Sequence, residues 1–449
     1  MKHLAIALLG ALGLVANNAL AWSNHTLPSY RAFETMPEVA NAAPVRVETL
    51  AAFLKAQEKS IEVLLANQEA WAQRHLDAYP PRPAALAFKS DPARTDEARQ
   101  TAFLRALRVA PNSKMALFLQ PDPWQTKPDA AALLPHDAVS TLPAGADSNY
   151  RFVGLQAGDQ TSALAVLATA ADEPDYGLDI NLWGENPSEW GKAYAFGTQS
   201  FGASAISFAT QAPFHMGFFH EDRIIYLAAP FVKRTFPLLR VHQFSTLAAL
   251  AFSTGHAYWG WRFTGMALHY VQDLTQPFHA NLAPGNASIK LIGINLLAMV
   301  GLPRMKDEMV QLLSNRHLGL EKYQNQLVLR AALSRQETAI EPSLRNAKQD
   351  ASYPAWTDLY ARDVVSLQSY AAGTRLARVL VDAMPPKYVS DPAFDFGMHE
   401  TGVDLVAEVG RLDAAKRAEL DRVTVELLGN FGAHSRNVVR GVLRLAAAP

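Results

Sequence analysis

Two histidine–carboxylate pairs with a spacing of four residues stand out in this 449-residue sequence. His269 precedes Asp273, and His317 precedes Glu321. Residues i and i+4 lie on one face of a helix, so the imidazole and the carboxylate of each pair can contact a single ion. His279 lies between the two pairs, just beyond the proline that ends the first helix. Helical bundles often build metal sites from such inward-facing groups, so the pattern predicts a metal centre.

The composition restricts the ligands and the partners of such a centre. The chain contains no cysteine, so an ion must be bound by histidine, aspartate, glutamate and backbone groups. Zinc with nitrogen and oxygen ligands suits a hydrolase, because it lowers the pKa of a bound water to about 7. The net charge of −1 gives no electrostatic reason to expect a nucleic-acid partner.

The N-terminus is typical of an exported protein. A positive start is followed by an apolar stretch at 4–16, and Ala19 and Ala21 occupy the positions that a signal peptidase reads. Removal of a signal peptide of residues 1–21 would expose the amine of Trp22 close to His25, where both could bind an ion. We expect a periplasmic or secreted protein without a transmembrane span, because no other stretch is long and apolar enough.

Hydrophobic periodicity predicts helices along most of the chain. Helices are expected within residues 45–76, 160–171, 254–275, 305–331, 355–384 and 403–443, and few stretches alternate with the period of a strand. We therefore predict an all-α fold, with residues 22–449 forming the mature helical domain. Residues 40–150 lack candidate ligands in a convincing arrangement, so we interpret them as an insertion or a subdomain.

The order of these motifs resembles that of the bacterial zinc-dependent phospholipase C family. The order comprises a tryptophan at the cleavage site, a nearby histidine, the string HYVQDLTQPFHA that begins at His269, and the pair His317 and Glu321. Fungal and plant zinc-dependent single-strand nucleases share that family's fold. The resemblance implies an all-α domain with three zinc ions. It implies three sets of ligands: Trp22, His25 and Asp273; His269 and Asp273 with two further residues; and His279, His317 and Glu321.

The two further ligands of the second ion should lie upstream of the first pair. The family's carboxylate stands at a helix end after small residues, which favours Asp172, with Asp175 and Asp179 as competitors. The histidine is His215, with His220 as the alternative. By resemblance, Asp172 is also the catalytic carboxylate that orients or deprotonates the attacking water, which would react as a zinc-bound hydroxide.

Several features favour a phospholipid substrate at a membrane surface. The last ligand is Glu321, as in the phospholipases, where the nucleases usually carry aspartate, and the chain is not basic. Residues 289–302 form an almost uninterrupted apolar run, which fits either an interfacial loop or a buried helix. We expect hydrolysis of the head-group phosphodiester of phosphatidylcholine-like lipids. The alternatives are a nuclease or nucleotidase on the same scaffold, and a non-catalytic exported binding protein.

Overall fold

The computed structural model describes residues 24–125, 132–145, 151–202 and 207–448. Helices account for about 62% of the chain and strands for only 3%, which confirms the predicted all-α fold. The predicted signal peptide and Trp22 lie outside the described residues.

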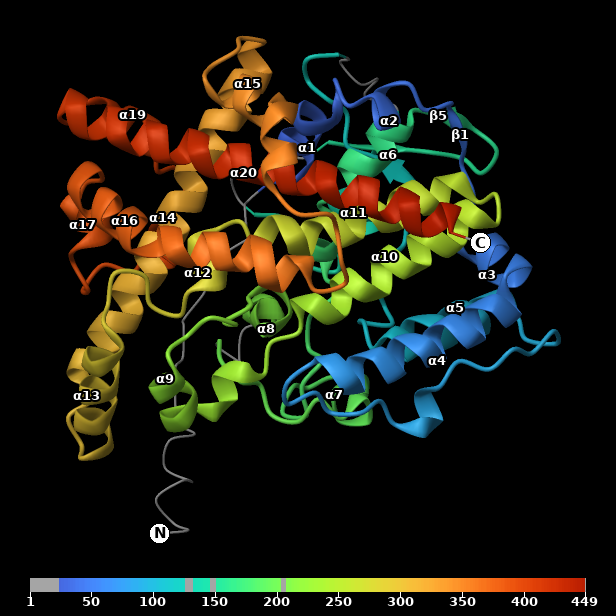
Figure 1. Ribbon diagram of the computed structural model, residues 1–449, viewed down its shortest axis with the longest axis horizontal. Coiled ribbons are helices and arrows are strands. Elements are labelled where there is room, and N and C mark those ends of the chain that lie inside the picture. The colour runs from blue at the N-terminus through green and yellow to red at the C-terminus, as the bar shows by residue number, and fades with distance from the viewer. Residues whose placement is uncertain (1–23, 126–131, 146–150, 203–206, 449) are drawn as a thin grey trace.

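Three long helices pack together at the centre of the molecule (Figure 1). They are α10 (Pro237–Ser253), α11 (Ala257–Asp273) and α20 (Ala414–Ala447), and the long helix α14 (Arg304–Ser334) lies to one side of them. Helix α11 packs against α10, α20 and α6 (Ala163–Ala170), and every residue from Tyr258 to Asp273 is buried. The helix predicted at 254–275 therefore forms the middle of the fold, where its side chains are held on all sides.

Further helices surround this centre. They are α1 (Thr26–Phe33), α2 (Pro37–Ala40), α3 (Leu50–Ala56), α4 (Glu58–His75), α5 (Asp96–Leu107), α7 (Glu189–Tyr194), α8 (Ala212–His215), α9 (Arg223–Ala228), α12 (Pro277–Ala280), α13 (Ser288–Met299), α15 (Ile340–Arg345), α16 (Leu367–Ala383), α17 (Pro386–Val389), α18 (Phe396–His399) and α19 (Leu405–Gly410). Single turns such as η5 (Glu173–Tyr176) connect several of them. The strands are two or three residues long: β1 (Val45–Arg46) pairs with β5 (Gln160–Thr161), and β4 (Phe152–Gly154) lies between β2 (Phe118–Leu119) and β3 (Leu133–Leu134).

Residues 40–150 share the apolar core of the central helices. The ring of Phe53 in α3 stacks at 6.1 Å on the ring of Trp259 in α11, and Ile61 of α4 and Phe103 of α5 belong to the same buried cluster. This region therefore packs directly on the helix that carries His269 and Asp273.

A glycine sets the distance between α11 and α6. A Cβ atom on Gly265 would lie only 2.5 Å from the Cβ of Ala170 and 2.5 Å from the carbonyl oxygen of Leu167. Only glycine permits this approach, which brings the end of α6 against the next turn of α11, where His269 lies.

The apolar run 289–302 forms α13 and the turn that follows it. The run is helical, where one alternative expected a loop, and most of it is exposed, where the other expected a buried helix. Its contact with an interface stays a prediction. Only Leu291 and Ile294 of α13 are buried, whereas Ile289 and Val300 are more than 70% exposed. Within the described part of the chain, no helix combines the length and the apolar character needed to cross a bilayer.

Candidate metal centre

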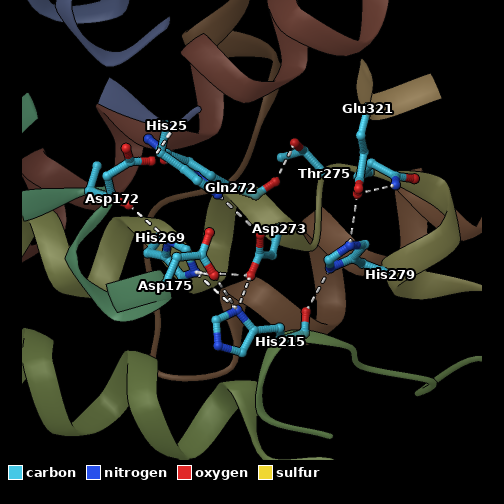
Figure 2. A network of polar contacts seen from close by, with 12 residues as sticks. His25, Asp172, Asp175, His215, His269, Gln272, Asp273, Thr275, His279 and Glu321 are labelled. Atoms are coloured by element: carbon cyan, nitrogen blue, oxygen red, sulfur yellow. Dashed lines mark hydrogen bonds and ion pairs between the residues drawn. The ribbon is translucent and has the colours of Figure 1, made fainter. Parts of the chain in front are cut away.

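Three groups of buried side chains offer ligand atoms at metal-binding distances. Within each group, one nitrogen or oxygen atom per residue lies within 4.8 Å of the others. The groups are His25, Asp175 and His269; His215, His269 and Asp273; and His279, His317 and Glu321. Figure 2 shows that the groups belong to one continuous network of polar contacts.

These side chains come from six separate segments. His25 precedes α1, Asp175 lies in η5, His215 ends α8, His269 and Asp273 lie near the end of α11, His279 lies in α12, and His317 and Glu321 lie in α14. The two predicted i, i+4 pairs therefore do lie on helices. The intervening fold brings them, with His279, into the same region.

The second group is the tightest. The Nε2 atom of His269 lies 3.0 Å from Nδ1 of His215, and Oδ2 of Asp273 lies 2.9 Å from Nδ1 of His215 and 3.4 Å from Nε2 of His269. Donor atoms bonded at about 2.0–2.1 Å to a tetrahedral zinc ion are about 3.3 Å apart. The three atoms thus have the spacing of ligands around a single ion.

Asp273 directs its two oxygen atoms to different partners. Oδ2 faces His215 and His269, whereas Oδ1 lies 3.4 Å from Nε2 of His25. Oδ1 accepts no hydrogen bond from the described residues, although it is buried. The carboxylate is therefore placed to contribute one oxygen atom to each of two ions.

The third group lies on the other side of the α11–α12 turn. Nε2 of His279 lies 3.0 Å from Nε2 of His317, and Oε1 of Glu321 lies 2.7 Å from His317 and 3.3 Å from His279. The Gln276 amide donates a hydrogen bond to the same oxygen, whereas Oε2 of Glu321 has no such partner among the described residues.

Three of the imidazoles are held through their outer nitrogen atom. In each case Nδ1 faces an oxygen atom that can only accept a hydrogen bond: Gln272 Oε1 at 2.8 Å from His25, the Ala171 carbonyl at 2.8 Å from His269, and the His215 carbonyl at 2.9 Å from His279. In the neutral imidazole, which is the form that binds a metal, this arrangement places the proton on Nδ1 and leaves the lone pair of Nε2 directed into the cluster. Metal-binding histidines are oriented in this way.

His215 is oriented by a carboxylate instead. Its Nε2 atom lies 3.4 Å from Oδ2 of Asp179, while its Nδ1 atom faces Asp273. Asp179 is fully buried and accepts hydrogen bonds from the Arg240 guanidinium and the Tyr270 hydroxyl. Burial alone would raise the pKa of Asp179, but Arg240 and the hydrogen bonds outweigh it and lower the pKa. The sequence suggested Asp179 only as a competing ligand, and nothing in it indicated this orienting contact.

Asp172 and Asp175 have different surroundings. Oδ1 of Asp175 lies 3.7 Å from Nε2 of His269, inside the cluster. Asp172 instead accepts a hydrogen bond from the backbone N–H of His25 at 2.7 Å, and its other oxygen accepts from Gln120 and Tyr176, each at 3.0 Å. The geometry therefore favours Asp175 as the ligand and gives Asp172 the role of holding the segment at His25.

Of the two candidate histidines, the structure brings only His215 into the cluster. His220 lies elsewhere, and its Nε2 atom is 2.8 Å from the carbonyl oxygen of Arg362, at hydrogen-bond distance.

The charges of the cluster favour a bound cation. Burial lowers the pKa of His25 and His215, but hydrogen bonds and the charges of nearby carboxylates outweigh it and raise the pKa values to about 9 and about 10. For His269 burial dominates, and its pKa lies well below the ordinary value. Carboxylates that stabilise positive charge at neutral pH would stabilise a metal ion in the same way.

Comparisons with protein-family models, with curated proteins and with solved structures found no match for this chain. The residues themselves restrict the chemistry. Imidazole and carboxylate donors without thiolates, several of them closely spaced, fit zinc or another divalent ion of similar preference.

Proposed function

We propose that this chain is an exported zinc-dependent hydrolase of the phospholipase C type, which cleaves the head-group phosphodiester of glycerophospholipids. The observation that carries the proposal is the convergence of three buried histidine–carboxylate groups. Asp273 lies between the first two, and the carbonyl of His215 links the second group to His279 of the third. Their order along the chain is the order that characterises the zinc-dependent phospholipases.

Each ion would be held by a separate set of residues. Trp22, through its amine and carbonyl, would join His25 and Asp273; Asp175, His215, His269 and Asp273 would hold the second ion; and His279, His317 and Glu321 would hold the third. Zinc held here would activate a water for attack and neutralise the phosphate oxygens.

The protein's own residues provide the orientation and the proton acceptor. Oδ1 of Asp175 lies among the imidazoles, 3.7 Å from Nε2 of His269, where a carboxylate could orient a water held by the ions and accept its proton. Asp172, the residue predicted for this role, is occupied by three hydrogen-bond donors. We therefore assign proton acceptance to Asp175, and we assign to Asp172 the role of holding the backbone at His25.

The substrate would approach from the side of α14. His317 is 9% exposed, whereas the other ligands in the described residues are at most 4% exposed. The group that contains His317 is thus the best placed to meet a phosphate that enters from solvent.

The test combines metal analysis with two assays. Mature protein with a verified N-terminus should contain about three zinc ions per chain and release a phosphorylated head group from phosphatidylcholine, without cleaving single-stranded DNA. Cleavage of DNA alone would identify a nuclease on this scaffold. Fewer than two zinc ions with no hydrolysis would identify a non-catalytic binding protein.

A further inference from the structure

A single exposed apolar surface dominates one edge of the molecule. Of the 16 large hydrophobic residues that are exposed in the described chain, seven fall between residues 289 and 305. We call these seven residues the α13 surface: Ile289, Leu296, Leu297, Met299, Val300, Leu302 and Met305. Scattered single hydrophobic residues are normal on proteins, but a cluster of this kind marks an interaction site.

Basic residues flank the α13 surface. The segment 286–306 contains Lys290, Arg304 and Lys306, and no aspartate or glutamate. The first acidic residues after it are Asp307 and Glu308, and Glu308 is paired with Arg304 at 2.7 Å. An apolar helix with cations at its ends matches the chemistry of a phospholipid interface, where acyl chains lie beneath phosphate groups.

The α13 surface stands at the periphery of the fold. Figure 1 shows α13 and α9 at the edge of the molecule, away from the central helices. Helix α9 contacts α13 and contributes two more exposed residues, Ile224 and Leu227. With 12 residues α13 is about 18 Å long, which suits a helix that lies in the head-group region and is too short to cross a bilayer.

The helix is also directly connected to the candidate metal centre. It joins α12, which carries His279, to α14, which carries His317 and Glu321. These three residues form one ligand group, and His317 is its most exposed member.

We propose that the α13 surface docks the protein on a phospholipid bilayer, with its apolar side chains among the acyl chains and its lysines near the phosphates. The choice of a lipid as the occupant rests in part on the proposed phospholipase function. Docking itself is measurable without any hydrolysis, so the two proposals can fail separately.

The experiment measures sedimentation of the full mature protein with phosphatidylcholine vesicles. The double variant Val300→Asp/Leu302→Asp should reduce the bound fraction at least about tenfold, because it places two charges where apolar side chains would be buried. Its zinc content and its hydrolysis of a soluble short-chain phosphatidylcholine should equal those of the wild type. Val63→Asp is the matched control, since Val63 is 61% exposed on the distant helix α4.

Each outcome decides between the proposals. Vesicle binding by the double variant at the wild-type level would overturn the docking surface and leave the proposed activity intact. Loss of binding in a protein that hydrolyses no phospholipid would support docking and overturn the activity. A wild type that forms dimers and ignores vesicles, with a monomeric double variant, would show that a second copy covers this surface.

Discussion

The Nε2 atom of His269 lies 3.0 Å from the Nδ1 atom of His215. Because the outer nitrogen of His269 already donates to a backbone carbonyl, its inner nitrogen presents a lone pair to the other imidazole. The contact therefore requires a proton on Nδ1 of His215, or a metal ion in the place of that proton. The two nitrogen atoms are thus arranged so that a cation can replace the proton between them.

Replacing Asp273 should have the largest effect of any single substitution in the centre. In Asp273→Asn, two ions lose a shared carboxylate, so zinc content should fall to about one per chain and activity by more than about 100-fold. Elemental analysis and a phosphodiesterase assay measure both. Asp382→Asn, on an exposed position of α16, should change neither quantity. Full zinc content in Asp273→Asn would refute the shared ligand.

The two candidate carboxylates near η5 can be separated by substitution. Asp175→Asn should remove about one zinc ion, because its oxygen lies among the imidazoles. Asp172→Asn should retain the ions and weaken their binding about tenfold, because it loosens the backbone at His25 and removes no ligand. Competition with a chelator measures the two affinities. A larger loss of zinc in Asp172→Asn than in Asp175→Asn would establish Asp172 as the ligand, as the sequence favoured.

Asp179 should act through the orientation of His215. Asp179→Asn should weaken zinc binding by about 10–100-fold and also destabilise the fold, because it leaves Arg240 buried without its partner. Tyr270→Phe keeps that ion pair and should weaken zinc binding less. Zinc titration and thermal unfolding distinguish the two effects. Tyr194→Phe removes a buried hydroxyl contact elsewhere, and an equal loss of affinity there would indicate general loosening.

Zinc-free and zinc-loaded protein should respond oppositely to pH. The folded-state pKa values of His25 and His215 are raised, so their contribution to stability is complete below about pH 6.5 and is lost as the pH rises towards 9 and 10. Zinc requires the neutral imidazoles, so its affinity should increase over the same range. Denaturant unfolding with and without chelator tests the first trend. Calorimetry of zinc binding in two buffers should detect the release of more than one proton per chain. If zinc binding released no proton, the imidazoles would already be neutral, and both trends would be refuted.

The sequence was informative where the chemistry is local. The pairs of His269 with Asp273 and of His317 with Glu321 follow from helix geometry, and the structure places both on helices and near His279. The choice between Asp172 and Asp175 could not be made from the sequence. Which carboxylate turns inward depends on a single helical turn and on Gln120, which lies more than fifty residues upstream.

The solvent exposure of residues 289–302 also could not be predicted from the local sequence pattern. The apolar run 289–302 has the composition of a buried helix, but among the described residues no element covers most of α13, and only the tertiary structure shows this. The contact between Asp179 and His215 likewise arises from tertiary packing, since Arg240 reaches Asp179 from a distant helix.

Two glycines provide a matched test of the helix packing. Gly265→Ala should lower the free energy of unfolding by about 1–3 kcal/mol, because its methyl group would collide with α6. In Gly293→Ala on α13, the added methyl group would meet no neighbouring segment of the described chain within 4 Å, so the free energy of unfolding should rise by about 0.5–1 kcal/mol. Denaturant titration measures both. A stabilising Gly265→Ala would contradict the close approach of α6 and α11.

The backbone around His215 connects two of the three ligand groups. The carbonyl oxygen of His215 accepts from the ring of His279, and the N–H of Gly217 donates to the carbonyl of His279 at 2.7 Å. The ring of His215 belongs to the second ligand group, while its carbonyl holds His279, a ligand of the third group. A shift of this short stretch would thus be transmitted to both pockets at once, so the centre behaves mechanically as one unit.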